Sequence, residues 1–253
     1  MDEITVETVT DVDLTDTVLI EGLPGVGNVG KLAVNHLLDE TDAELVCRVY
    51  SEHFPPQVSV DDDGIASLTA MEFYATTLDD QDVLLLTGDH QAQSNHGHYR
   101  ITNAILDIAD DYDVSTIYAL GGVPTGELIE EYDVLGAATV DTMVEELSEY
   151  GVEFRDNEPT GGIVGVSGLL LGLGENRSIN AACLMGETSG YMVDPKSARA
   201  VLEILQDALS FDVDYSELED RAEKMEEVVS RIQEMESQQS APAPTEDDLR
   251  YIG

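Results

Sequence analysis

The chain has 253 residues, of which 42% are hydrophobic, and its 53 acidic and 11 basic residues give a net charge of −42. Apolar runs such as residues 83–86 exclude a disordered chain, and the scarcity of Lys and Arg excludes nucleic acid and anionic membranes as partners, because counterion release requires basic stripes. The acidic residues are spread through every segment, which predicts a globular protein from a halophilic source, since molar salt screens the self-repulsion of such a surface.

Taken in chain order, the hydrophobic periodicity predicts strands that alternate with helices. The expected elements are an edge strand within 1–17, a strand at 18–20, a helix at 29–38, a strand at 44–51, a hairpin of 58–60 with 65–71, a strand at 83–87, a helix at 99–110, strands at 115–120 and 134–138, a helix at 142–150, a strand at 179–185 and a helix from 195 to 209. This order predicts an α/β sandwich whose sheet is mostly parallel with an antiparallel part. Ligand or partner loops should gather at the carboxyl ends of the parallel strands.

A glycine loop follows the first apolar strand. Gly25, Gly27 and Gly30 spell the dinucleotide-binding pattern G-x-G-x-x-G. The same stretch, extended to Lys31, also gives G-x-x-x-x-G-K, but Leu32 stands where a P-loop needs Ser or Thr, which disfavours ATP hydrolysis. Two interpretations stay open, one with a phosphate at these glycines and one in which they only permit a tight turn and close helix packing.

Metal and catalytic signals are weak. His90, His96 and His98 fall within one short stretch and include an H-x-H pair, the best metal candidate in the chain, although surface histidines are the default interpretation. Ser167 lacks the spacing of a nucleophile elbow. We therefore identify no catalytic constellation and expect a protein that is not an enzyme and has no cofactor.

Cys47 and Cys183 both lie in apolar predicted strands, where they are expected to be small buried side chains rather than a disulfide. The sequence starts without a basic, apolar leader, and no apolar run approaches the length of a membrane span. These features predict a cytoplasmic protein.

The character of the chain changes after residue 211. A narrow apolar seam follows at helical spacing, and it either docks on the chain's own core or makes a subunit contact. The seam consists of Leu218, Ala222, Met225, Val229 and Ile232. Residues 237–245 have the composition of a linker, and apolar and aromatic residues return at the end, as in a docking peptide. We therefore divide the chain into a core domain at 1–211, a C-terminal helical segment at 212–236 and a flexible linker with a docking tail at 237–253.

Three stretches together resemble the archaeal proteasome assembly chaperone family, which is related to the second eukaryotic proteasome assembly chaperone. They are Glu-Gly-Leu-Pro-Gly-Val-Gly-Asn-Val-Gly at 21–30, Gly-Gly-Ile-Val-Gly at 161–165 followed by Gly-Leu-Leu-Leu at 168–171, and Glu-Thr-Ser-Gly-Tyr-Met-Val-Asp-Pro at 187–195. The resemblance extends over residues 3–211. It implies a three-layer α/β/α fold similar to purine nucleoside phosphorylases, no established enzymatic activity, self-assembly into a homo-oligomer, and a C-terminal tail that inserts between proteasome α subunits.

The tail carries the partner-binding residues that this resemblance implies. The family's tail ends in a hydrophobic residue, a tyrosine and one further residue, whereas Tyr251 here is third from the end, so the pattern is shifted by one position. Leu249, Tyr251, Ile252 and Gly253 are carried over as the contacts to proteasome α subunits. The leading hypothesis is an ATP-independent, chaperone-like proteasome-binding protein. The alternative is a nucleotide- or nucleoside-utilising enzyme that holds phosphate at Gly25–Gly30 with Lys31.

Overall fold

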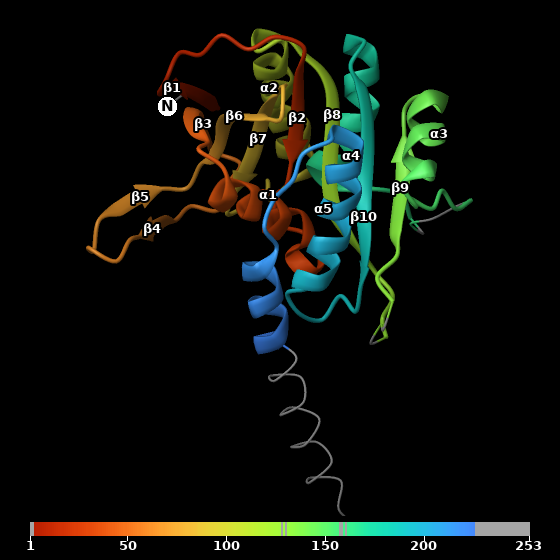
Figure 1. Ribbon diagram of the computed structural model, residues 1–253. Coiled ribbons are helices and arrows are strands. Elements are labelled where there is room, and N and C mark those ends of the chain that lie inside the picture. The colour runs from red at the N-terminus through yellow and green to blue at the C-terminus, as the bar shows by residue number, and fades with distance from the viewer. Residues whose placement is uncertain (1–2, 128, 130, 157–158, 160, 226–253) are drawn as a thin grey trace, which may run out of the picture.

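The computed structural model describes residues 3–127, 129, 131–156, 159 and 161–225. Its main feature is an eight-stranded sheet with helices on both faces (Figure 1). The strands of this sheet are β1 (Ile4–Thr8), β2 (Thr17–Glu21), β3 (Glu44–Ser51), β6 (Met71–Leu78), β7 (Gln81–Gly88), β8 (Val114–Pro124), β9 (Val134–Ala138) and β10 (Asn180–Thr188). The helices are α1 (Val29–Glu40), α2 (Asn95–Asp111), α3 (Asp141–Glu149), α4 (Gly165–Gly174) and α5 (Pro195–Leu209), with short 3-10 turns η1 (Val26–Asn28) and η2 (Glu175–Arg177).

The strand order is β1-β3-β6-β7-β2-β8-β10-β9. Three neighbouring pairs, β7/β2, β2/β8 and β8/β10, are parallel, and the other four are antiparallel. The expectation of a mostly parallel sheet is therefore corrected to a parallel centre with antiparallel flanks. The physical reason is a tight connection that the sequence reading missed. β6 turns directly into β7 through Asp79, whose φ of 53° is the left-handed conformation of a hairpin turn.

Several predicted elements are confirmed. Strands β3 and β9 have the expected bounds, β1 lies at the edge of the sheet, and α5 begins where predicted. The side chain of Asp194 caps α5 by accepting a hydrogen bond from the backbone N–H of Ser197 at 3.1 Å, and Pro195 occupies the first turn. The expected hairpin also forms, but as a separate two-stranded sheet, β4 (Val58–Val60) with β5 (Ala66–Leu68), that projects away from the body (Figure 1).

Two apolar layers hold the helices on the sheet. Helices α1, α3 and α5 pack on one face, where Ile20, Leu85 and Leu184 point toward them. Helices α2 and α4 cover the other face, which includes Leu19 and Phe73. Side chains alternate between the faces because a strand has a repeat of two residues. Buried core positions therefore lie on both sides of the central strands.

The chain after α5 returns to the first of these faces. Residues 216–225 are helical, and Leu218 is buried in the same apolar cluster as α1 and α5, with Ala222 buried beside it. This part of the apolar seam therefore packs on the chain's own core. Val229 and Ile232 lie outside the described residues. None of the described helices is both long and apolar enough to span a membrane.

Candidate functional site

The glycine loop lies at the carboxyl end of β2, beside the end of β8, as the sequence predicts. A Cβ atom at Gly30 would lie 2.0 Å from the carbonyl oxygen of Leu120 in β8, so α1 can approach this strand only with glycine there. Gly27 has a φ of +61°, which favours glycine, whereas a Cβ at Gly25 would meet nothing closer than 4.0 Å. Packing and backbone conformation thus account for Gly27 and Gly30 but not for Gly25.

Lys31 faces a different part of the surface from Gly25. Its Nζ atom lies 2.7 Å from Oδ1 of Asp89, and both residues line a groove that also contains Arg48 and Glu72. Gly25 instead lines a crevice on the other side of the loop. The structure therefore does not bring the lysine and the first glycine of the pattern to one pocket.

This crevice is a cavity of about 240 Å³ at the carboxyl ends of the parallel strands. It is enclosed by the glycine loop, the end of β8, strand β10 and the segment that enters α4, and its lining is mostly apolar, with Val26, Leu120 and Met185 among its walls. Gln91 bridges two of these walls, because its Nε2 donates to the carbonyl of Pro24 at 2.8 Å and its Oε1 accepts from the backbone N–H of Val166 at 3.3 Å. These two hydrogen bonds therefore connect the glycine loop to the start of α4 at the edge of the crevice.

A buried carboxyl group lies behind this crevice. Glu21, the last residue of β2, is completely buried, and its Oε1 accepts a hydrogen bond from the backbone N–H of Leu23 at 3.1 Å. The hydroxyl of Ser167, which lines the crevice, donates to Oε2 of Glu21 at 2.8 Å. Burial raises the pKa of Glu21 to about 7, although both hydrogen bonds act in the opposite direction. Near neutral pH this group can therefore take up or release a proton.

Sequence reasoning missed Glu21, although one signal was present. Glu21 is an acid directly after the predicted apolar strand and directly before a glycine, where the strand pattern calls for another apolar residue.

The two cysteines are buried core side chains. Cys183 lines the crevice, and burial raises the pKa of its thiol above the normal range. Burial also raises the pKa of Cys47 to about 12, and both cysteines are free and buried, which confirms their predicted role as small core side chains.

The three histidines of the weak metal candidate take different positions. The ring of His90 lies against the side chain amide of Gln57. The ring of His98 points inward, where its Nδ1 is buried without a partner among the described residues and burial lowers its pKa. His96 lies beside Glu3 instead. The structure therefore separates His90 and His98 from His96. The predicted partner-binding residues, Leu249, Tyr251, Ile252 and Gly253, lie outside the described residues.

Comparisons with known proteins agree with this fold along most of the chain. The protein MJ1210 of Methanocaldococcus jannaschii, which is described as uncharacterized, is 40% identical over 244 residues, which cover 95% of this chain and 93% of that protein. The crystal structure of Pyrococcus furiosus PbaB, described as an archaeal proteasome activator, matches with a TM-score of 0.86 and 35% identity over 92% of this chain and 100% of that chain.

A second Pyrococcus furiosus protein, PbaA, is described as an archaeal homolog of proteasome-assembly chaperone. Its structure matches with a TM-score of 0.77 and 27% identity, covering 92% of this chain and 93% of that chain. The model of the PAC2 family matches residues 19–233, which include the glycine loop, the crevice and α5. The chain therefore belongs to the PAC2 family.

Proposed function

We propose that this protein is an ATP-independent, non-enzymatic proteasome-binding protein that acts in proteasome assembly or activation. The observation that carries this proposal is the similarity to PbaB, an archaeal proteasome activator, over the whole length of that chain. The similarity to PbaA, a homolog of a proteasome-assembly chaperone, supports the same class of function. An archaeal cytoplasmic location follows from this function.

The proposed contact is the C-terminal tail. Leu249 and Tyr251 would fill apolar pockets between proteasome α subunits, Ile252 would contact their rim, and the carboxylate of Gly253 would pair with a lysine. The proposed division of the chain into a core at 1–211, a helical segment at 212–236 and a tethered tail at 237–253 gives the tip the reach that this docking requires.

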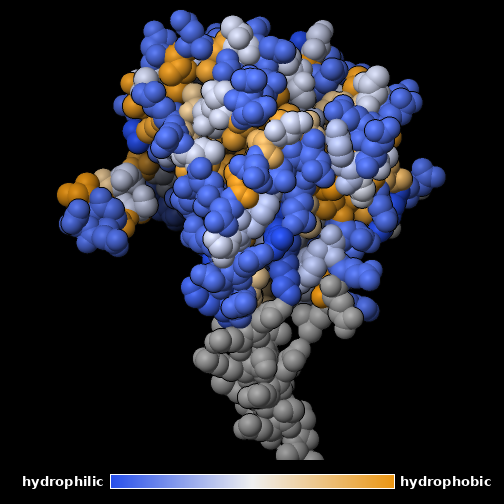
Figure 2. All heavy atoms as spheres, viewed as in Figure 1, coloured by the Kyte–Doolittle hydropathy of each residue, from blue (hydrophilic) through white to orange (hydrophobic). Residues whose placement is uncertain are grey.

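The proposed active form is a homo-oligomer. Several tails on one body would bind the α ring with a higher combined affinity than a single tail, because each later contact is intramolecular. The β4–β5 hairpin supports a subunit contact, since Val58, Val60 and Ile65 expose 54%, 63% and 62% of their surface on an element that projects from the body. In Figure 2 this hairpin, at the left, carries hydrophobic residues beside hydrophilic ones.

The rival function is a nucleotide- or nucleoside-utilising enzyme with phosphate at Gly25–Gly30. The packing of Gly30 on β8 and the ion pair of Lys31 with Asp89 favour the structural interpretation of this loop. Isothermal titration with NAD, ATP and nucleosides in high salt separates the two functions. Saturable micromolar binding that is lost in Gly25→Val would support the enzyme.

Co-sedimentation with proteasome α rings from the same source, in high salt, tests the proposed function. The full chain should sediment with the rings, whereas a chain that ends at Thr245 and the variant Tyr251→Ala should not. Ser240→Ala, in the linker, is the matched control and should bind like the full chain. Equal binding by the truncated chain would rule out the tail mechanism, and no binding by any form would rule out the proteasome as partner.

A further inference from the structure

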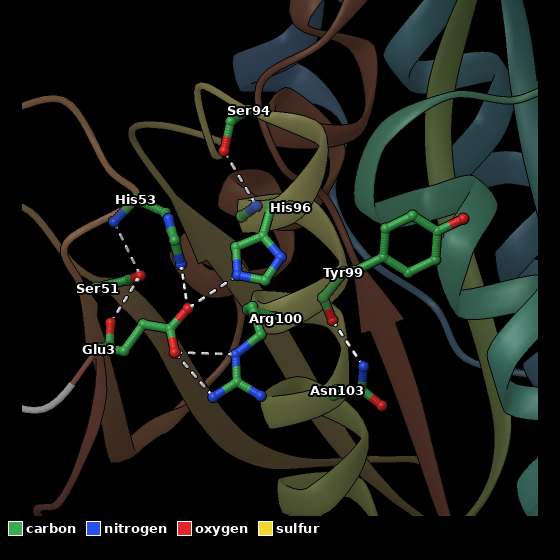
Figure 3. Close-up of polar contacts among 9 residues, drawn as sticks. Glu3, Ser51, His53, Ser94, His96, Tyr99, Arg100 and Asn103 are labelled. Carbon is green, nitrogen blue, oxygen red and sulfur yellow. Dashed lines mark hydrogen bonds and ion pairs between the residues drawn. The ribbon is translucent and has the colours of Figure 1, made fainter.

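Three side chains from separate parts of the chain meet beside the first turn of α2 (Figure 3). Glu3 precedes β1, His53 follows β3, and His96 lies in α2. Oε1 of Glu3 is 2.8 Å from Nε2 of His53 and 3.3 Å from Nε2 of His96. The ligand atoms of all three residues lie within 4.8 Å of one another. Two imidazole nitrogens therefore face the same carboxylate oxygen.

The backbone fixes both histidines. A Cβ atom at Gly97 would lie 2.8 Å from the Cβ of His53, so the glycine lets His53 rest against α2. The carbonyl of His53 accepts a hydrogen bond from the backbone N–H of Gln93 at 3.1 Å. Ser94 caps α2 by accepting from the backbone N–H of Gly97 at 3.1 Å, which holds the turn that carries His96. The two imidazole rings meet edge to face, with 5.5 Å between their centroids.

Arg100 orients the carboxylate. Its Nε and Nη2 atoms lie 3.1 Å and 2.9 Å from Oε2 of Glu3, which leaves Oε1 directed at the histidines (Figure 3). Metal-binding carboxylates are commonly held through their second oxygen in this way, and such partners contribute to metal affinity. Arg100 therefore acts as a positioning residue for the group.

We propose that Glu3, His53 and His96 bind a borderline divalent metal ion such as Zn²⁺. Two imidazole nitrogens and one carboxylate oxygen match the donors that such ions prefer, whereas Mg²⁺ and Ca²⁺ prefer oxygen donors throughout. Ligand atoms about 2.0–2.1 Å from a tetrahedral ion lie roughly 3.3 Å apart. Glu3 and His96 already have this spacing, whereas His53 lies closer to Glu3, at 2.8 Å, and must withdraw slightly for the ion to enter.

The exposure of the group fits a site that solvent can reach. The His53 side chain is 15% exposed and that of Glu3 is 31% exposed, whereas the His96 side chain is 71% exposed. The ion would enter from the side of His96 and complete its coordination with water. Once bound, it would join the segment before β1 to β3 and α2, and thereby raise the melting temperature as binding to the folded state alone does.

The test uses the untagged full chain, stripped with a chelator and dialysed against ZnCl₂ in high salt, with bound zinc measured by elemental analysis. The wild type should bind about one zinc per chain. His53→Ala and His96→Ala should each lower the affinity for zinc tenfold or more, because each variant removes one of only three protein ligands. Zinc should raise the melting temperature of the wild type more than that of either variant. His90→Ala is the matched control, because His90 contacts Gln57 and does not belong to this group of ligands.

A second group of described residues, His36, Glu40 and Glu217, is the competing candidate for the zinc site. Zinc binding that is lost in Glu217→Gln but kept in His96→Ala would overturn the proposal, as would no binding by the wild type at micromolar free zinc. Because the His96 side chain is mostly exposed, His96→Ala should fold normally, which circular dichroism checks. None of these outcomes depends on the proteasome, so the proposed function and this site can fail separately.

Discussion

The hydroxyl oxygen of Ser167 lies 2.8 Å from Oε2 of Glu21, although 146 positions separate the two residues in the chain. The contact joins the first turn of α4 to the end of the central strand β2. Because Glu21 is completely buried, its carboxyl group has a pKa of about 7 rather than its ordinary acidic value. A crevice at the carboxyl ends of the parallel strands is thus backed by a group that titrates near neutral pH.

The first prediction concerns the pH dependence of stability. The folded state holds a proton on Glu21 up to about pH 7, whereas the unfolded chain releases it near 4.5, so this group makes the free energy of unfolding fall as the pH rises through that window. The shift corresponds to about 3 kcal/mol. Glu21→Gln should remove this contribution and be the more stable protein at pH 8. Denaturant unfolding between pH 5 and 8 in high salt measures it.

The control for this experiment is Glu145→Gln, which changes an exposed acid of α3. It should keep the pH dependence of the wild type. A Glu21→Gln variant whose stability follows the same pH curve as the wild type would contradict the raised pKa.

The second prediction separates two glycines of one sequence pattern. Gly30→Ala places a methyl group 2.0 Å from the Leu120 carbonyl and should lower the free energy of unfolding by about 1–3 kcal/mol or more. Gly25→Ala has room and extended backbone angles, so it should change stability by less than about 0.5 kcal/mol. Thermal unfolding of both variants measures the difference, and equal losses would argue against the packing role of Gly30.

The third prediction tests the cap of α5. Asp194→Ala removes the acceptor for the backbone N–H of Ser197 and should cost about 1 kcal/mol of stability. Asp207→Ala is the matched control, because Asp207 is exposed in the last turn of the same helix, where an acid opposes the helix dipole. This control should leave stability unchanged or raise it slightly. A loss of stability equal to that of Asp194→Ala would contradict the capping role of Asp194.

The fourth prediction concerns salt. The net charge is −42, so acidic side chains repel one another in the compact state. Lowering the ionic strength removes the screening of this repulsion and should lower the melting temperature and loosen the fold. Melting curves from low to molar KCl measure this dependence. A melting temperature that does not change with salt would contradict the inference of a halophilic protein.

The fifth prediction addresses the proposed oligomer. Val60→Ser and Ile65→Ser together remove the two most exposed apolar side chains of the β4–β5 hairpin and should shift the protein toward monomers. Light scattering after size-exclusion chromatography in high salt gives the mass. Val6→Ser, which changes an exposed apolar side chain of β1, is the control and should leave the mass unchanged. A wild-type monomer, or a variant with the wild-type mass, would exclude a contact through this hairpin.

Much of the fold follows from local pattern, and the misses have physical causes. Strand β3 contains several good strand formers, Leu45, Val46, Val49 and Tyr50, and β9 begins with Val134 and Leu135, so both strands were predictable. Strand β6 was missed because the apolar residues up to Met71 were assigned to the expected hairpin, although Met71 begins β6. Helix α4 was missed because its glycines have low helix propensity, and burial of Val166 and Leu170 compensates for them.

The candidate sites show the same limit. The glycine loop is local, and its place at the end of a parallel strand was predictable. The pairing of Glu21 with Ser167 is tertiary, and no spacing in the sequence indicates it. The helix predicted to begin at residue 99 in fact begins at Asn95, so His96 and His98 both lie within α2. Two residues apart on a helix, His96 and His98 point to nearly opposite sides, so only His96 reaches Glu3.

The position of β2 also determines when the protein can fold. This strand is made early, at Thr17–Glu21, but its two neighbours are Gln81–Gly88 and Val114–Pro124. During synthesis its apolar residues therefore have no partner strand until β7 has emerged, and they lack the second one until β8 follows; closing such distant contacts is slow.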